Sequence, residues 1–122
     1  MGSLKVITMA TAVVMVNCLL CPLLSLAQQA RPVFDVITIN AAITPPVAQY
    51  TLAGIAAAEK SGAAGLIILL DTPGGLDTSM REMAKGILNA KVPVIVFVYP
   101  PGARAASAGV IITAAAHIAV MA

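Results

Sequence analysis

Residues 66–75, LIILLDTPGG, decide the fold of this chain because they join an apolar run to a turn that contains two adjacent glycines. The residues from Leu66 to Leu70 have the length of a strand and do not alternate between apolar and polar. A continuous run of this kind is typical of a parallel sheet that is covered on both faces. We therefore predict a buried strand that closes at Asp71 and leads into a tight turn.

The sequence on either side of this stretch alternates between strand and helix patterns. Upstream, residues 33–39 are rich in β-branched side chains and predict a strand, while residues 47–60, between Pro45-Pro46 and Ser61-Gly62, predict a helix. Downstream, the pattern predicts a helix from a cap at Asp77, Thr78 or Ser79 to about Ala90, a strand over 94–99, a helix over 105–116 and a strand over 117–121. The order β-α-β-α-β-α-β predicts an α/β domain with a largely parallel sheet.

The first 27 residues have the pattern of a secretory signal peptide. Lys5 supplies the positive charge, residues 6–24 are mostly apolar, and residues 25–27 place small side chains at positions −3 and −1 of a cleavage site. Asn17 and Pro22 interrupt the apolar stretch, which favours cleavage over the alternative of an uncleaved membrane anchor. We expect residues 1–27 to be the signal peptide and residues 28–122 to be the mature chain.

Both cysteines, Cys18 and Cys21, lie in the predicted signal peptide. They would leave the protein with it, so they indicate neither a disulfide nor a metal site in the mature chain. We expect no metal and no cofactor.

The composition is unusually apolar for a soluble domain, with 60% hydrophobic and 10% charged residues and a mean hydropathy of +0.98. Three explanations compete: a parallel sheet buried on both faces, an oligomer interface, or a further part of the chain that covers the surface. The net charge is only +2, and no basic cluster is present. The charge pattern therefore gives no support to nucleic-acid binding.

A second motif, AASAG at residues 105–109, follows the predicted strand over 94–99. The Ser107 hydroxyl has no packing role among alanines and glycine, and it lies near the predicted start of a helix, whose dipole stabilises a nearby oxyanion. Ligands of parallel α/β folds meet the carboxyl ends of the strands, where this motif and the glycine turn both lie. We predict that Ser107 is a nucleophile and that the N–H groups of Ala108 and of Gly74 or Gly75 form its oxyanion hole.

Each motif also has a simpler interpretation. Pro-Gly-Gly is a common turn, and a serine among alanines often bonds to its own helix backbone. Asp71 is expected to bond to nearby turn N–H groups, and Arg104 either orients a substrate carbonyl or only positions the backbone. Met80, Met83 and Ile87 form an apolar stripe that lies in the core or lines a hydrophobic groove.

The two motifs together resemble a known family. Residues 66–77 resemble the oxyanion-hole segment of the Clp protease proteolytic subunit and its relatives, and residues 105–109 resemble their nucleophile segment. A narrower resemblance, which includes the signal segment and Arg104, is to the NfeD family of membrane-associated serine proteases. It covers essentially the whole mature chain.

This resemblance implies a Clp protease/crotonase-like fold, incomplete in this chain, with residues 28–122 as the N-terminal portion of the protease domain. It implies an endopeptidase with a Ser–Lys dyad that cleaves hydrophobic peptide segments. It also implies export across the inner membrane to the periplasmic, extracytoplasmic face, and a stomatin-like membrane protein as partner. We further expect a homo-oligomer.

The sequence departs from the family at the general base, which in the relatives is a lysine about forty residues beyond the nucleophile. No lysine follows Ser107 here, and His117 opens a predicted apolar strand, where a histidine more often packs or caps. Lys60, Lys85 and Lys91 lie in predicted helices or at their ends, as solvated charges. We therefore expect the general base lysine to be absent from this chain, and the chain to be a truncated or partial protease that is inactive alone.

Three other functions remain open. A non-catalytic interaction module of the cell envelope would keep the fold and use its apolar surface to dock a membrane partner. A crotonase-like acyl-CoA enzyme would use paired backbone N–H groups to hold a thioester enolate, although a signal segment argues against cytoplasmic acyl-CoA chemistry. A signal-peptide peptidase is a further Ser–Lys enzyme to consider.

Overall fold

The structure is a computed structural model that describes residues 31–122, and the predicted signal peptide, with Cys18 and Cys21, lies outside these residues. Strands and helices alternate along the described chain, which confirms the predicted order. The elements are β1 (Phe34–Asn40), α2 (Pro45–Ser61), β2 (Gly65–Asp71), α3 (Asp77–Leu88), β3 (Val94–Val98), α4 (Ala108–Ala115) and β4 (Ile118–Met121).

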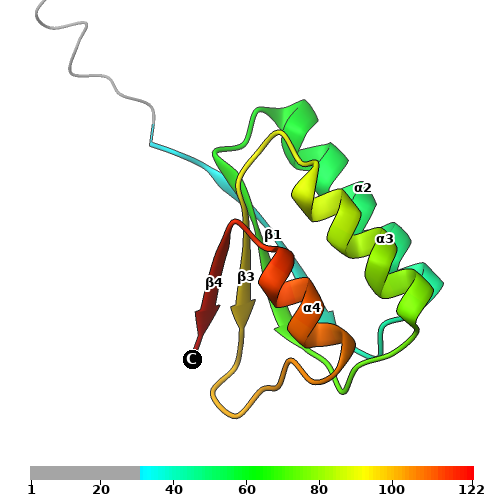
Figure 1. Cartoon of the computed structure of the whole chain (residues 1–122). Coiled ribbons are helices and arrows are strands. Elements are labelled where there is room, and N and C mark those ends of the chain that lie inside the picture. The colour runs from blue at the N-terminus through cyan, green and yellow to red at the C-terminus, as the bar shows by residue number, and fades with distance from the viewer. Residues whose placement is uncertain (1–30) are drawn as a thin grey trace, which may run out of the picture. The chain divides into compact units, whose positions relative to one another are not determined.

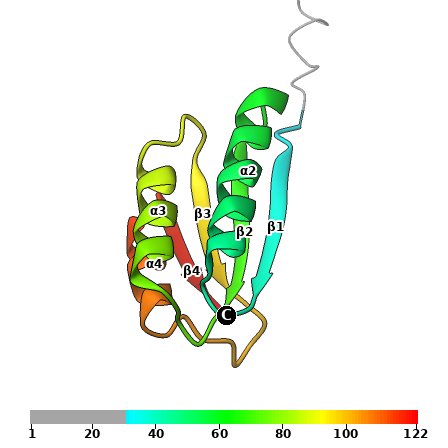
Figure 2. The same ribbon diagram turned by 90° about the vertical axis from the view of Figure 1, so that its right-hand side faces the viewer.

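The strands form a parallel sheet in the order β1-β2-β3-β4. Each strand is therefore added beside its predecessor, always in the same direction across the sheet. Parallel crossovers share one hand, so each helix is returned to the same side of the sheet. Figures 1 and 2 show the result, with α2, α3 and α4 together on one face.

The face of the sheet that the helices cover forms the hydrophobic core. Leu66, Ile68 and Leu70 of β2 point to this side and have no solvent exposure. Burial of one such side chain contributes roughly 1.5–3 kcal/mol relative to leaving it exposed. The other fully buried members of this core include Val94, Val96, Met83, Ile87 and Ile112.

The opposite face of the sheet, which we call the open face, is not covered by any element of residues 31–122 (Figure 1). Strand alternation and register place on it Val36, Ile67, Leu69, Ile95, Phe97, Ile118 and Val120. Val36 is 55% exposed and Ile118 is 52% exposed. The expectation that the apolar strands are covered on both faces is therefore not met within the described residues, because all the helices share one side.

Two helices begin at other residues than predicted. None of Asp77, Thr78 and Ser79 caps α3, whose N-cap is Leu76 without a side-chain hydrogen bond. The Leu76 N–H donates to the Ile43 carbonyl at 2.8 Å, which holds Leu76 in an extended conformation. The helix therefore begins at the next residue, Asp77. The helix predicted over 105–116 begins only at Ala108, because the residues before it pair with the loop after β2.

The other helix boundaries lie close to the predicted ones, although α3, predicted to run to about Ala90, ends at Leu88. Helix α2 begins at Pro45 and ends at Ser61, and the left-handed φ of 70° at its C-cap, Gly62, lets the Gly62 N–H bond back to the last turn. In the part of the chain that the structure describes, no helix combines the length and the apolar character needed to cross a bilayer.

Candidate active site

The loops that follow β2 and β3 are joined at the carboxyl edge of the sheet. The Thr72 N–H donates to the Arg104 carbonyl at 2.8 Å, and the Ala106 N–H donates to the Thr72 carbonyl at 3.1 Å. The Asp71 carboxylate, predicted to bind N–H groups of its turn, accepts the Arg104 N–H of the neighbouring loop at 3.1 Å. These bonds bring the glycine turn and the serine motif together, as predicted from their positions after neighbouring strands.

Ser107 has an unusual backbone conformation. Its φ of 50° and ψ of −112° lie outside the regions that L-residues favour, and within residues 31–122 no other non-glycine residue has a positive φ. Strain of this kind costs on the order of 1–3 kcal/mol and is found mainly where function requires it. The residue is the N-cap of α4, yet its side chain makes no capping hydrogen bond. Ser107 is therefore not a serine held by its own helix.

Gly74 packs directly against Ser107. A Cβ built on Gly74 would lie 2.8 Å from the Ser107 Cβ, 3.1 Å from the Ala106 carbonyl oxygen and 3.3 Å from the Ser107 Oγ. The φ of Gly74 is 109°, a conformation that L side chains rarely adopt. Only glycine fits this position, for reasons of both space and backbone.

The structure distinguishes between the predicted oxyanion-hole donors. Of the two predicted glycine donors, Gly74 is the one whose N–H is already bonded within the turn, since it donates to Thr72 Oγ1 at 3.1 Å. Gly75 pairs with Ile43 through its two neighbours: the Gly74 carbonyl accepts the Ile43 N–H, and the Leu76 N–H donates to the Ile43 carbonyl. In a parallel bridge of this kind the N–H of Gly75 itself points away from Ile43. Within residues 31–122, neither the Gly75 N–H nor the Ala108 N–H donates to a protein acceptor.

Gly75 is also restricted to glycine. A Cβ at this position would overlap the Ile43 carbonyl and amide. The close approach holds the Gly75-Leu76 strand against the segment before α2, where Ile43 is fully buried. The free N–H of Gly75 is thus carried by a rigid piece of backbone.

Two adjoining cavities lie beside Ser107, between α3 and α4. The first has a volume of about 240 Å³ and is lined by Gly75, Asp77, Met80, Ser107, Ala108 and Ile111. The second, of about 370 Å³, is lined by Met80, Arg81, Ala84, Lys85, Leu88 and Ile111. Because they share Met80 and Ile111, we describe them as one α3/α4 groove that leads away from Ser107. The Met80-Met83-Ile87 stripe is divided between the two predicted roles, with Met80 in this groove and the other two in the core.

The charged groups of the groove lie on its exposed rim. Asp77 and Arg81 form an ion pair across one helical turn, with 2.7 Å between the carboxylate and Nε. The hydrogen bond that Arg81 donates to this carboxylate, and then the negative charge of the carboxylate, raise the pKa of Arg81. Both side chains are well exposed, so the pair contributes little to stability.

No lysine or histidine of the described residues lines the cavity at Ser107. His117 lies at the amino end of the strands, opposite to the site, where its Nδ1 accepts the N–H of Val94, the first residue of β3, at 3.1 Å. Lys60 lies in the last turn of α2, and Lys91 follows α3, so both also lie at the amino end of the strands. Lys85 borders the outer part of the groove.

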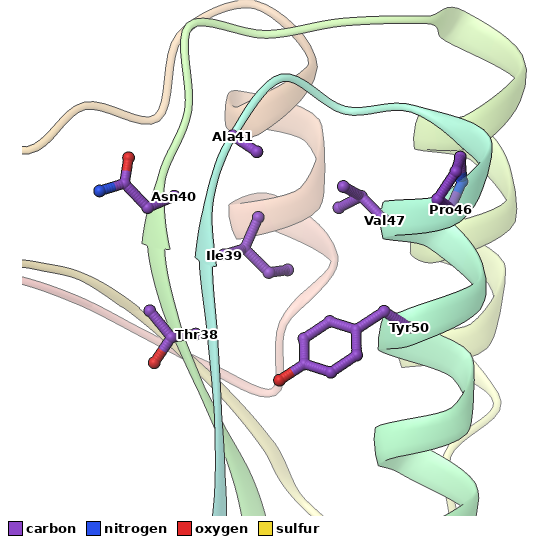
Figure 3. Close-up of a pocket in the computed structure, with 7 residues that line it drawn as sticks. All are labelled: Thr38, Ile39, Asn40, Ala41, Pro46, Val47 and Tyr50. Carbon is purple, nitrogen blue, oxygen red and sulfur yellow. The ribbon is translucent and has the colours of Figure 1, made fainter.

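A separate cavity of about 320 Å³ lies between the end of β1 and the start of α2. Figure 3 shows the Tyr50 side chain extending from α2 towards β1, with Val47 beside it. Neither Ser107 nor the glycine turn lines this cavity. In residues 31–122, no three His, Cys, Asp or Glu side chains are placed to hold a metal ion.

Comparison with solved structures shows that the chain has a Clp protease fold. The ClpP1 subunit from Listeria monocytogenes aligns with a TM-score of 0.57 and 23% identity, over 66% of this chain and 46% of that chain. No protein-family model matches the chain.

One relative of the chain is a membrane-bound protease. The chain is 48% identical over 68 residues to the membrane-bound protease PH1510 from Pyrococcus horikoshii, which is 56% of this chain and 15% of the relative. It also aligns with two mutants of 1510-N, a membrane-bound stomatin-specific protease. The serine-to-alanine mutant has a TM-score of 0.74 and 39% identity, over 75% of this chain and 44% of that chain. The lysine-to-alanine mutant, in complex with a substrate peptide, has a TM-score of 0.73 and 40% identity, over 75% and 42%.

These matches confirm the predicted resemblance to membrane-associated serine proteases of the Clp type. The chain spans less than half of each of these solved relatives, and a smaller part of PH1510.

Proposed function

We propose that this chain carries the nucleophile and the oxyanion hole of a membrane-associated serine endopeptidase. The observation that supports this most strongly is the strained Ser107, which packs against Gly74 while its hydroxyl is free of its own helix. A serine in a common turn or an ordinary helix would need neither the strained backbone nor a neighbour without a side chain, such as Gly74.

The geometry suggests how the chain acts on a peptide. The Ser107 Oγ attacks the scissile carbonyl, and the N–H groups of Gly75 and Ala108 hold the oxyanion that forms. Ala108 is the first residue of α4, so its N–H belongs to the free donors at the positive end of the helix. Loss of one donor of this kind typically lowers kcat by about 100-fold to 1,000-fold.

The serine hydroxyl also needs a proton acceptor, and we assign this role to a lysine outside residues 31–122. The support is that no described lysine or histidine lines the cavity, and that the 1510-N structures include both a serine and a lysine mutant. Residues 31–122 on their own are therefore proposed to be inactive.

The proposed substrate is a hydrophobic peptide segment, because the α3/α4 groove beside Ser107 contains Met80, Leu88 and Ile111. The names of the relatives support a membrane-associated enzyme with a stomatin-like partner. The proposal also includes residues 1–27 as a signal peptide, a site on the periplasmic face of the membrane, and a homo-oligomer.

Cleavage of a hydrophobic peptide tests the proposal, in the full-length protein, by which we mean the described residues together with the segment that supplies the lysine. Ser107→Ala is expected to abolish cleavage, because no other hydroxyl lines the cavity. Thr113→Val is the matched control, since it also removes a hydroxyl from α4, where Thr113 Oγ1 bonds only to the Gly109 carbonyl. If Ser107→Ala cleaves as fast as the wild type, the proposed function is wrong, and a non-catalytic interaction module of the same fold becomes the better interpretation.

A further inference from the structure

We propose that Thr72 is a positioning residue that holds the oxyanion-hole turn and the nucleophile in register. The inference rests on the proposed function. Thr72 has no solvent exposure and lies between the end of β2 and the glycine turn. Its backbone contacts the nucleophile loop, its hydroxyl contacts the glycine turn, and its methyl group contacts the start of α4.

The backbone of Thr72 holds the nucleophile loop. Its N–H and carbonyl bond to the Arg104 carbonyl and the Ala106 N–H, on either side of Ala105. This short parallel bridge fixes the chain immediately before Ser107. It extends the pairing of β2 and β3 past the ends of both strands.

The hydroxyl of Thr72 holds the glycine turn. Oγ1 accepts the Gly74 N–H at 3.1 Å and lies 3.3 Å from the Gly74 carbonyl oxygen, to which it donates. The side chain thus bonds to the peptide groups on both sides of Gly74, and the Gly74 carbonyl also accepts the Ile43 N–H at 2.8 Å. The next N–H along the chain is that of Gly75, which points away from Ile43 and has no protein acceptor in residues 31–122. Without the hydroxyl, the Gly74 N–H would be buried with no partner and would favour a different turn.

The methyl group of Thr72 supports the start of helix α4. A Cβ built on Gly109 would lie 2.7 Å from Thr72 Cγ2, so this glycine lets the helix pack directly on the methyl. Gly109 is buried and follows Ala108, whose N–H is the other proposed donor. The two branches of the Thr72 side chain therefore contact the residues next to the two proposed donors, Gly74 before Gly75 and Gly109 after Ala108.

Because the hydroxyl and the methyl group of Thr72 make different contacts, two substitutions are predicted to have distinct effects. Thr72→Val keeps the shape and the methyl but removes the hydroxyl, whereas Thr72→Ser keeps the hydroxyl and removes the methyl. If the hydroxyl orients the Gly75 N–H, Thr72→Val should lower kcat on the order of 10-fold to 100-fold with little change in KM. Thr72→Ser should keep kcat within about 3-fold and lower only the melting temperature.

The decisive measurement uses the full-length protein and a peptide aldehyde, which forms a tetrahedral adduct with a catalytic serine. Thr72→Val should weaken inhibition by the aldehyde by about the same factor as kcat, because the adduct needs the oxyanion hole. It should not change the affinity for an uncleaved peptide, measured in the Ser107→Ala background. Thr51→Val is the matched control, because Thr51 is also fully buried and its hydroxyl bonds only to Val47 within α2.

The outcomes separate this inference from the proposed function. If Ser107→Ala abolishes cleavage but Thr72→Val keeps wild-type kcat and aldehyde inhibition, the positioning role is wrong and the proposed function stands. If Ser107→Ala cleaves normally, both are wrong. Should Thr72→Val fail to fold, amide hydrogen exchange of the wild type decides: a Gly74 amide as protected as those of β2 supports the role, and one that exchanges as fast as Gly75 contradicts it.

Discussion

Gly74 lies so close to Ser107 that a Cβ on the glycine would be 2.8 Å from the Cβ of the serine. The contact joins residues that are far apart in sequence and both at strained or positive φ angles. It places the glycine turn beside the nucleophile, with the Gly75 N–H following directly along the chain. The turn and the serine thus form a single structural unit, whose parts cannot be changed independently.

The first prediction concerns this contact. Gly74→Ala should abolish peptide cleavage, because the new methyl would displace Ser107 and the φ of 109° is strained for alanine. Gly62→Ala is the control: its φ of 70° lies in the left-handed region, where alanine costs roughly 1–2 kcal/mol, and no atom of the described residues lies within 4 Å of the new Cβ. Cleavage rates and melting temperatures of both variants check this. Equal activity in the two variants would show that the contact is not needed.

The second prediction concerns the α3/α4 groove. Ile111 lines both of its cavities, so Ile111→Ser should raise KM for a hydrophobic peptide by about 10-fold, from the loss of apolar contact, with kcat little changed. Val110 is the neighbouring residue, is 56% exposed and lines neither cavity. Val110→Ser should therefore leave KM unchanged. Steady-state kinetics in the full-length protein decide, and equal KM values for the two variants would place the substrate elsewhere.

The third prediction concerns a buried hydroxyl in α3. Ser79 is 1% exposed, and its Oγ has no hydrogen-bond partner among residues 31–122. Most substitutions of buried residues destabilise, but Ser79→Ala should leave stability unchanged or raise it by up to about 1 kcal/mol, because it removes an unpaired polar atom and improves helix propensity. Ser61→Ala is the control, since the Ser61 hydroxyl bonds to Ala58 and Asp35 and its loss should destabilise slightly. Denaturant unfolding gives both values; a clear loss of stability in Ser79→Ala would mean that the hydroxyl has a partner.

The fourth prediction concerns the open face. If residues 31–122 are produced alone, this face should bind the dye ANS and drive self-association, because its apolar side chains lie side by side. Replacement of Ile118 and Val120 by lysine should reduce both effects. Leu88→Lys is the control, since Leu88 is 67% exposed but lies on α3, on the other side of the sheet. Light scattering and dye fluorescence check this; a monomeric wild-type segment without dye binding would contradict it.

Much of the fold follows from local sequence pattern. The strand over 34–40, the helix that begins at Pro45 and ends before Gly62, and the buried strand before Asp71 all agree with the prediction. These features depend on neighbouring residues: β-branched runs favour strands, proline starts a helix and glycine ends one. The pairing of the glycine turn with Ser107 could also be predicted, because parallel strands bring their carboxyl ends to one edge.

The features that could not be predicted arise from contacts between distant segments. Leu76 becomes the N-cap of α3, in place of a polar residue, because Ile43 binds its N–H. Helix α4 begins late because Thr72 holds the chain before it. A signal for Thr72 was present in the sequence, since a β-branched hydroxyl follows the strand directly, but nothing local indicates which N–H it would bind.

Residue order and pattern alone were thus enough to predict an alternating α/β chain with a serine and a double glycine at one edge of its sheet. Tertiary packing decided which N–H groups at this edge are free to bind a ligand. The Thr72 hydroxyl takes the Gly74 N–H and leaves that of Gly75 free, and the fold holds Ser107 at a positive φ. Packing also put every helix of residues 31–122 on one face, because the strands add in a single direction and their crossovers share one hand. Orientation of a peptide group depends on its three-dimensional neighbours, and these are not encoded in any short stretch of sequence.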